Sequence, residues 1–293
     1  YILIRAAQLV VTSVWEKFKL PHIEHLDAFI FITSCTEIMH AWFYHQYTIP
    51  DVYARWITKM ANMDPTMLHL LKNMYDEKLK YGYRSDFLLH WCKKHHIEPT
   101  TSDFLSRPLP CCVVHPQDGS SCWRNSLRRT YNGIVNSLLI YTPVHLLPPL
   151  LLSPSSFLET PLSSSLKVGG RILQSTTFLS VFIGLCWTGV CLIRTSPFAD
   201  RWESRGPLLG CFICGFSIFI ESKSRRMELA LKVLADALTS VWRRGERSGL
   251  VKSLLGSDVA FFCVGLGVIC SYYHTNREIM RSSVRGIYGG LFE

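Results

Sequence analysis

The stretch Ile172-Leu-Gln-Ser-Thr-Thr-Phe-Leu-Ser-Val-Phe-Ile-Gly-Leu-Cys-Trp-Thr-Gly-Val-Cys-Leu-Ile193 contains 22 residues and no charged side chain, and Arg171 and Arg194 flank it. At about 1.5 Å per residue, a helix of this length is roughly 33 Å long, enough to cross a hydrocarbon core of about 30 Å. Only a helix or a closed barrel satisfies its own backbone in lipid, and this run has no strand-like alternation. It predicts a transmembrane helix.

The composition fits a membrane protein with substantial polar segments. Of 293 residues, 48% are hydrophobic, and 31 Lys and Arg against 22 Asp and Glu give a net charge of +9. The basic residues form short clusters beside apolar runs, which favours contact with anionic lipid headgroups. A nucleic-acid partner is not expected. Most of the 11 cysteines lie in apolar runs. That distribution is not typical of a secreted disulfide framework.

The first quarter of the chain predicts two helices. Residues 1–17 resemble the end of a helix, and residues 26–44 form an apolar run that carries Glu37 and His40. Such groups are costly in lipid, so they should face protein or a water-filled cleft. A short amphipathic core helix is the alternative for this segment.

Residues 45–125 are polar and mixed, which predicts a linker with short helices. Asp64 before Pro65 is typical of an N-cap followed by proline at the first helical position. Ser85 could cap another short helix that runs to His96, with Pro99 beyond its end.

Three further apolar runs accompany the opening stretch. Residues 134–152 contain Pro143, Pro148 and Pro149, which predict a broken spanning helix or a re-entrant or interfacial one. Ser and Pro then mark residues 153–165 as a turn region. The other two runs are residues 206–220, which are short for a bilayer at about 22 Å, and residues 259–276.

Residues 227–243 predict an amphipathic helix. One polar stripe, with a polar residue at every fourth position, consists of Glu228, Lys232, Asp236 and Ser240. The opposite apolar face consists of Leu231, Leu234, Leu238, Val241 and their neighbours. The helix either lies on the membrane or packs in a bundle with its stripe facing a cleft.

Two blocks of sequence recur in the same order, which predicts an internal repeat. Thr12-Ser-Val-Trp15 recurs as Thr239-Ser-Val-Trp242. Farther along each copy, Asp27-Ala-Phe-Ile-Phe31 matches the similar block Asp258-Val-Ala-Phe-Phe262. Both copies end in aromatic residues and a histidine. Since membrane folds are often built from repeats, we expect two homologous helical modules. The first is expected to be truncated, because the chain opens without Met in the middle of an apolar run.

A cluster of thiols and one imidazole precedes the first apolar run of the second module. It consists of Cys111, Cys112, His115 and Cys122. These residues are expected to act as one structural unit. They are good zinc ligands in type, and a fourth ligand would come from the second adjacent cysteine or from Cys92, His95 or His96. Packing without metal is the alternative, so no metal ligand and no cofactor are assigned.

The segment from Glu221 to Arg226 follows an apolar run directly. It contains Lys223 and Arg225, and Glu221 and Arg225 are spaced to pair on one helix face. An interfacial charged anchor is expected, with an anion or headgroup contact as the alternative. The small residues Ser180 and Gly184 allow close helix approach. No catalytic triad, phosphate loop or paired-carboxylate site is found, so an enzyme is not expected.

The chain resembles the transmembrane protein 135 family, in particular its fungal members. The resemblance covers most of residues 108–276: the Cys/His element, Tyr141-Thr-Pro143, the start of the opening stretch, Ile220-Glu-Ser-Lys-Ser-Arg-Arg226 and the last apolar run. Residues 1–57 resemble the end of the family's first half. The resemblance implies a multi-pass membrane protein of peroxisomes and mitochondria, linked to lipid metabolism and distantly similar to Tim17-type import proteins.

These observations predict an all-α, polytopic membrane protein with three parts. Residues 1–57 would end a truncated first module, residues 58–125 would form the linker, and residues 126–293 would form a complete second module. The expected function is non-enzymatic lipid or metabolite handling, with membrane lipids and a homo-oligomeric or other membrane-helix partner. A translocase-like or scaffold component is the alternative, and an intramembrane enzyme or metal protein ranks last.

Overall fold

The computed structural model describes residues 1–21, 23–76, 86–97, 111–152, 154–197, 206–252, 256–276 and 278, and all regular elements in them are helices. The N-terminal part contains α1 (Ile2–Lys17), α2 (Leu26–Tyr44), η1 (Gln46–Thr48), α3 (Asp51–Met60), α4 (Pro65–Tyr75) and α5 (Asp86–Lys94). The rest contains α6 (Cys111–Val114), η3 (Pro116–Asp118), α7 (Cys122–Leu152), α8 (Pro154–Glu159), α9 (Pro161–Thr195), α11 (Gly206–Cys214), η5 (Gly215–Ile220), α12 (Lys223–Arg247) and α13 (Ser257–Thr275).

Three of the described helices are long and apolar enough to cross a membrane. They are α7, α9 and α13. The opening stretch forms the C-terminal two thirds of α9, whose 35 residues extend well beyond it. The short run at residues 206–220 is not among the three. It forms α11 and the 3₁₀ helix η5. Cys211, Cys214 and Ile218 are fully buried in protein, whereas Phe212, Phe216 and Phe219 remain 42–45% exposed.

The prolines at positions 143, 148 and 149 do not act as predicted. Helix α7 runs from Cys122 to Leu152 with Pro143, Pro148 and Pro149 inside it. The prediction of a broken or re-entrant segment is therefore wrong; helices in apolar surroundings tolerate proline because neighbouring groups satisfy the freed carbonyls. The predicted turn at residues 153–165 is also wrong. It holds α8 and the start of α9, each of which begins with a proline at its first residue, a position that suits proline.

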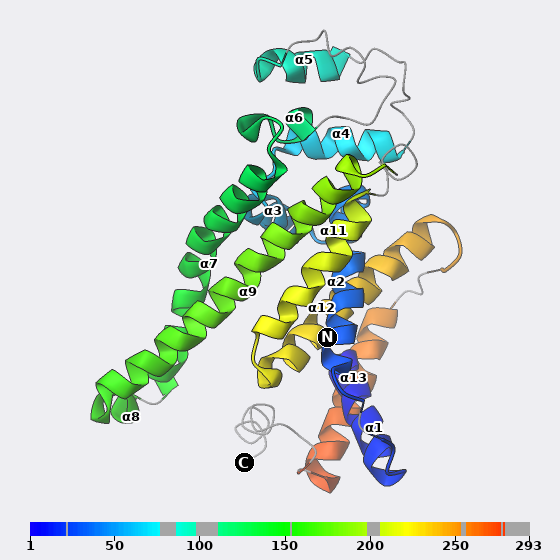
Figure 1. Ribbon diagram of the computed structural model, residues 1–293. Coiled ribbons are helices and arrows are strands. Elements are labelled where there is room, and N and C mark those ends of the chain that lie inside the picture. Colours follow the sequence, from blue (N-terminus) through cyan, green and yellow to red (C-terminus); the bar gives the residue numbers. More distant parts are fainter. Residues whose placement is uncertain are drawn as a thin grey trace.

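Helices α7 and α9 lie side by side along their length and reach α8 at one end (Figure 1). Small residues allow this close packing: a Cβ on Gly133 would lie 3.3 Å from the Ser180 Cα atom. The hydroxyls of Ser126 and Thr188 form a hydrogen bond of 2.7 Å across the pair. The small-residue pattern of the opening stretch thus has a structural role in helix packing.

Helix α2 lies at the centre of the bundle and packs against α12, α11 and η5. The hydrophobic core joins its C-terminal half, with Trp42 at 0% exposure, to Trp187 of α9 at 1%. Helices α9 and α11 cross at two glycines, where a Cβ on Gly189 would lie 2.5 Å from the Gly210 Cα atom. Because the two backbones lie so close together, no residue larger than glycine fits at this crossing.

Helices from the two ends of the chain pack against each other. Helix α1 packs on α13, far away in sequence, just as α2 packs on α12 (Figure 1). Ala6 of α1 is buried against Ile269 and Tyr273 of α13. Helices α1 and α2 therefore pack into the bundle that α9, α11, α12 and α13 form.

The linker helices α4, α5 and α6 gather at the end of the α7–α9 pair opposite α8 (Figure 1). The backbone N–H of Thr66 donates to Asp64 Oδ1 at 2.8 Å, which confirms Asp64 as the cap of α4. Ser85, the predicted cap of the next helix, and Pro99, predicted to lie beyond its end, are outside the described residues. The predicted domain boundaries at 57/58 and 125/126 fall inside α3 and α7.

Candidate functional site

Three of the four residues of the predicted Cys/His element meet in space. Cys111 starts the short helix α6, His115 follows that helix, and Cys122 starts α7. Their side chains converge with that of Cys191, near the end of α9, and the four sulfur and nitrogen ligand atoms all lie within 4.8 Å of one another. The Cys122 Sγ and Cys111 Sγ atoms are 3.4 Å apart.

Burial distinguishes this cluster from a surface group of thiols. His115 is 1% exposed, and neither of its ring nitrogens has a hydrogen-bond partner among the described residues. Interaction with Cys191 first, and then with His115 and Cys122, lowers the pKa of the Cys111 thiol well below its ordinary value, although burial opposes the shift. The cluster thus combines a buried imidazole whose ring nitrogens form no hydrogen bond within the described residues with a thiol whose pKa is lowered.

A polar network orients the Cys191 side of the cluster. The Asn125 side-chain amide points at the Cys191 sulfur, with a nitrogen–sulfur distance of 4.0 Å. Asn125 is held in turn by Arg129, whose Nε donates to Asn125 Oδ1 at 2.7 Å. The Arg129 guanidinium also donates to the Ala61 carbonyl and lies 3.7 Å from the ring centroid of Trp187.

The other candidate ligands of the element lie elsewhere. Cys112 packs beside the hydrophobic core instead of joining the cluster. Cys92 is buried in that core, and the His95 ring lies 4.2 Å from the Trp91 ring. The expected origin of a fourth group, from Cys112 or the 92–96 segment, is therefore wrong, because Cys191 takes that place.

The charged segment after η5 forms a compact network. Glu221 is 1% exposed and pairs with Arg225, with 3.3 Å between Oε1 and Nη1. Arg225 also lies 3.0 Å from His145 Nε2 and bonds to Ser175, so it links α12 to α7 and α9. Lys223 is exposed.

Arg226 of the same segment turns back on η5. It is 9% exposed and donates to the carbonyls of Glu221 and Phe219, at 2.9 and 2.8 Å. Two of the four charged residues, Glu221 and Arg226, are thus buried in protein, which gives them a role inside the bundle beyond that of an interfacial anchor.

The polar stripe of the amphipathic helix α12 makes contacts along its length. Glu228 pairs with Arg5 of α1, and Lys232 pairs with Asp236 at 3.0 Å. Ser240 is fully buried and hydrogen-bonds Thr48 at 2.8 Å. Of the two alternatives for this helix, the structure shows packing in the bundle.

An apolar cavity of about 480 Å³ lies beside this stripe. Residues of α2, α3, α9 and α12 line it, and Lys232 and Asp236 are its charged wall. Its volume falls in the usual range for small-molecule sites, about 300–1,000 Å³.

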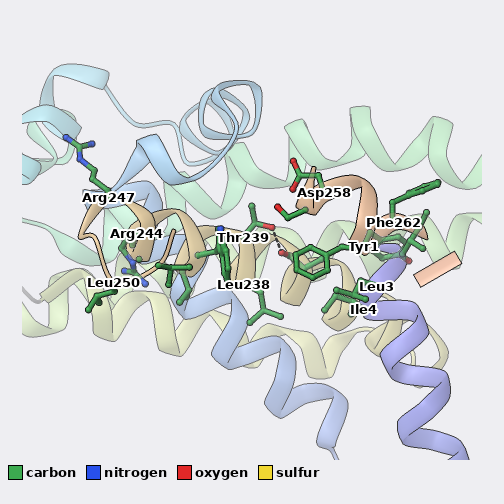
Figure 2. Close-up of a pocket in the computed structure, with 18 of the residues that line it drawn as sticks. Tyr1, Leu3, Ile4, Leu238, Thr239, Arg244, Arg247, Leu250, Asp258 and Phe262 are labelled. Atoms are coloured by element: carbon green, nitrogen blue, oxygen red, sulfur yellow. Dashed lines mark hydrogen bonds between the residues drawn. The ribbon is translucent and has the colours of Figure 1, made fainter. Parts of the chain in front are cut away.

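A larger open groove of about 1360 Å³ runs along the outer side of α12 (Figure 2). Arg244, Arg247 and Leu250 lie at one end, and Leu238 and Thr239 lie in the middle (Figure 2). The far end is built by Tyr1, by Leu3 and Ile4 of α1, and by residues of α13 such as Phe262 (Figure 2). The groove is therefore basic at one end and mainly apolar in the middle, and Asp258 adds an acidic side chain at the far end (Figure 2).

The two arginines of the groove differ in their surroundings. Arg244 is bound by α2: it pairs with Glu37 Oε1 at 2.7 Å and lies 3.1 Å from His40 Nδ1. Arg247 is exposed, lies 4.2 Å from the Tyr47 ring centroid, and has no ion-pair partner within the described part of the chain. Arg247 is thus the cation of the groove that remains available to a ligand.

Sequence reasoning missed Cys191 and the groove for different reasons. Cys191 is 69 residues from Cys122 and lies in an apolar run, so only its position three residues before the buried Arg194 signals a polar environment. The groove depends on how α1, α12 and α13 are placed. The predicted apolar face of α12 indicated part of the groove. Two residues of that face, Leu238 and Val241, line the groove and remain 49% and 48% exposed.

Comparison with known proteins gives no family assignment. No family model matches this chain, and no solved structure matches it either.

Proposed function

We propose that this chain is a non-enzymatic, multi-pass membrane protein that binds a single-chain anionic lipid in the groove along α12. The observation that carries the proposal is the distribution of charge in that groove: an exposed arginine at one end, mainly apolar side chains beyond it, and the acidic Asp258 at the opposite end. A long-chain carboxylate has the same division into a charged head and an apolar tail.

The length and openness of the groove favour an elongated ligand. At about 1360 Å³ it is larger than the usual small-molecule pocket. Large apolar residues are exposed along it, including Leu250 at 84% and Phe262 at 50%. Contiguous exposed apolar surface of this kind marks membrane or ligand contact sites, and burial of each CH₂ of a ligand contributes about 0.8 kcal/mol.

Binding of a fluorescent long-chain fatty acid to the purified chain in lipid nanodiscs tests the proposal. We expect saturable binding that Leu238→Trp abolishes, because the indole would fill the middle of the groove. Arg247→Gln should weaken binding about fivefold, which corresponds to the loss of roughly 1 kcal/mol from one exposed charge contact.

Two variants of matched chemistry serve as controls. Arg243→Gln removes the same charge from the same helix, but Arg243 does not line the groove and donates instead to the Thr48 carbonyl. Leu173→Trp adds the same bulk at a 65% exposed position of α9 outside the groove. Equal affinity in all four variants, or no saturable binding, would contradict the proposal. Absence of binding together with co-purified membrane partners would favour the translocase-like or scaffold alternative.

Peroxisomes and mitochondria are the organelles we propose, on the basis of the family resemblance. Carbonate extraction followed by fractionation tests both parts of this localisation. The chain should stay in the membrane pellet, because three helices are long and apolar enough to span. Enrichment in a different organelle would contradict the assignment without affecting the membrane prediction.

We also propose that α1–α2 and α12–α13 are copies of one helical pair. Each helix packs on the non-equivalent helix of the other copy, α1 on α13 and α2 on α12. An approximate two-fold relation between copies produces this exchange, since both contacts are then the same contact. When Asp27 is aligned with Asp258, the buried Gly265, Ile269 and Tyr273 of α13 fall on Ser34, Ile38 and Trp42, all of which are buried in α2.

A further inference from the structure

We propose that Cys111, His115, Cys122 and Cys191 bind one Zn²⁺ ion in a closed tetrahedral site that fastens the linker to the membrane helices. The residue types support this assignment, since three thiolates and one imidazole are a common structural zinc set. The lipid proposal does not depend on it.

The geometry fits a single ion. Zn–S bonds of about 2.3 Å and Zn–N bonds of about 2.0–2.1 Å place tetrahedral ligand atoms roughly 3.5–3.8 Å apart. The four ligand atoms already lie within 4.8 Å of one another, and the Cys111 and Cys122 sulfurs are 3.4 Å apart. The four ligand atoms are therefore already close to the spacing that one tetrahedral ion requires.

His115 provides independent support for a bound ion. It is 99% buried, yet neither ring nitrogen has a hydrogen-bond partner among the described residues. A buried polar group without a partner destabilises the folded state. Coordination of one nitrogen to zinc would remove that cost at one of the two positions.

Groups behind the ligands match the needs of a zinc–thiolate centre. Three thiolates and Zn²⁺ leave a net charge of −1. The guanidinium of Arg194 is buried and interacts electrostatically with Cys111 and Cys191, so it would balance that charge. The Asn125 amide points at the Cys191 sulfur from behind, in the manner of the outer contacts that orient metal ligands.

The position of the site indicates its role. It joins three elements that the sequence separates: α6 of the linker, the start of α7, and the end of α9. Four protein ligands fill a tetrahedral ion and leave no open position for substrate, so the site is structural rather than catalytic. Zinc would stabilise the junction between the linker helices and the α7–α9 pair, because the binding free energy of such sites contributes to folding.

Metal analysis of the full chain, purified under reducing conditions without added metal, tests the proposal. We expect about one zinc per chain in the wild type and less than about a tenth of an equivalent in Cys191→Ser, because a structural site loses its affinity with one ligand. Cys186→Ser and Cys112→Ser are matched controls that should keep the zinc: Cys186 is buried on the same helix, and Cys112 adjoins Cys111, but neither belongs to the cluster.

A second measurement covers the case in which Cys191→Ser does not fold. Replacement of zinc by Co²⁺ in the wild type should give the intense visible bands of a tetrahedral thiolate site, and His115→Cys should keep the metal and shift those bands. Folded wild-type protein without zinc would overturn the proposal, as would a Cys111–Cys122 disulfide in protein whose thiols were blocked at lysis. Equal zinc content in Cys191→Ser and the wild type would overturn it too.

Discussion

Helices α2 and α13 share a sequence pattern, but α2 lies inside the bundle and α13 lies at its edge. Both begin near an aspartate followed by apolar residues and end in aromatic residues and a histidine. Eleven of the 19 residues of α2 are buried, against three of 19 in α13. The apolar pattern therefore specifies a helix in apolar surroundings. Whether those surroundings are protein or lipid depends on the elements that pack against the helix.

One charged position accounts for part of this difference. Glu37 of α2 aligns with Val268 of α13 when the two aspartates are superposed. Glu37 binds both Arg244 and Ser240 of α12, at 2.7 and 3.0 Å. A carboxylate needs such partners inside a bundle, whereas valine needs none. This is the pattern expected if α2 is fixed among protein neighbours and α13 is free to face lipid.

The largest expected effect comes from one aligned pair of phenylalanines. Phe31 of α2 is 3% exposed and Phe262 of α13 is 50% exposed. Phe31→Ala should lower the free energy of unfolding by about 3–5 kcal/mol, since it leaves a cavity in the core, whereas Phe262→Ala should cost less than about 1 kcal/mol. Unfolding in mixed micelles titrated with SDS measures both. Equal losses would show that the two helices are equally enclosed.

Removing the carboxylate of Glu37 should have the next largest effect. Glu37→Gln leaves the Arg244 guanidinium without its ion-pair partner, which should cost about 1.5–3 kcal/mol in the same unfolding assay. Glu37→Gln combined with Arg244→Met should cost less than the sum of the two single variants, because a shared interaction is lost only once. Additive losses would show that the pair is not coupled.

Two glycines of α13 test how closely α1 packs on it. A Cβ on Gly265 would lie 3.0 Å from the Leu3 backbone nitrogen, whereas a Cβ on Gly267 would meet nothing within 4 Å. Gly265→Leu should therefore force α1 away and cost about 1–3 kcal/mol. Gly267→Leu, on the same helix and of the same size, should be close to neutral. If both variants behave alike, α1 does not pack on α13 as described.

The sequence predicted the helices well because their signals are local. The boundaries of α2 follow directly from the apolar run at 26–44, and Asp64 caps α4 as its position before Pro65 predicts. The prediction of a break at Pro143 was wrong because proline is most costly in helices surrounded by water, whereas α7 is an apolar helix that continues through it.

The sites were predicted less completely because their partners are distant in sequence. The local spacing brought Cys111, His115 and Cys122 together as a candidate unit, but Cys191 joins them through the packing of α7 on α9. The pair Glu221–Arg225 follows from helical spacing, whereas the contact of Arg225 with His145 does not. Long-range packing thus supplies the parts that a single sequence does not reveal.

The smallest expected effect on stability concerns the outer surface of α13. Val264 is 59% exposed, so Val264→Ala removes little buried surface and should change the free energy of unfolding by less than about 0.5 kcal/mol. A lipid that carries a photoreactive group in its acyl chain should label α13 around Val264 and the exposed Leu139 of α7, but not Phe31 or Ile38 of α2. Mass spectrometry of the labelled peptides measures this. Labelling of Phe31 at the level of Val264 would place α2 in contact with lipid, and the contrast between the two helices would then have to come from their loops rather than from their neighbours.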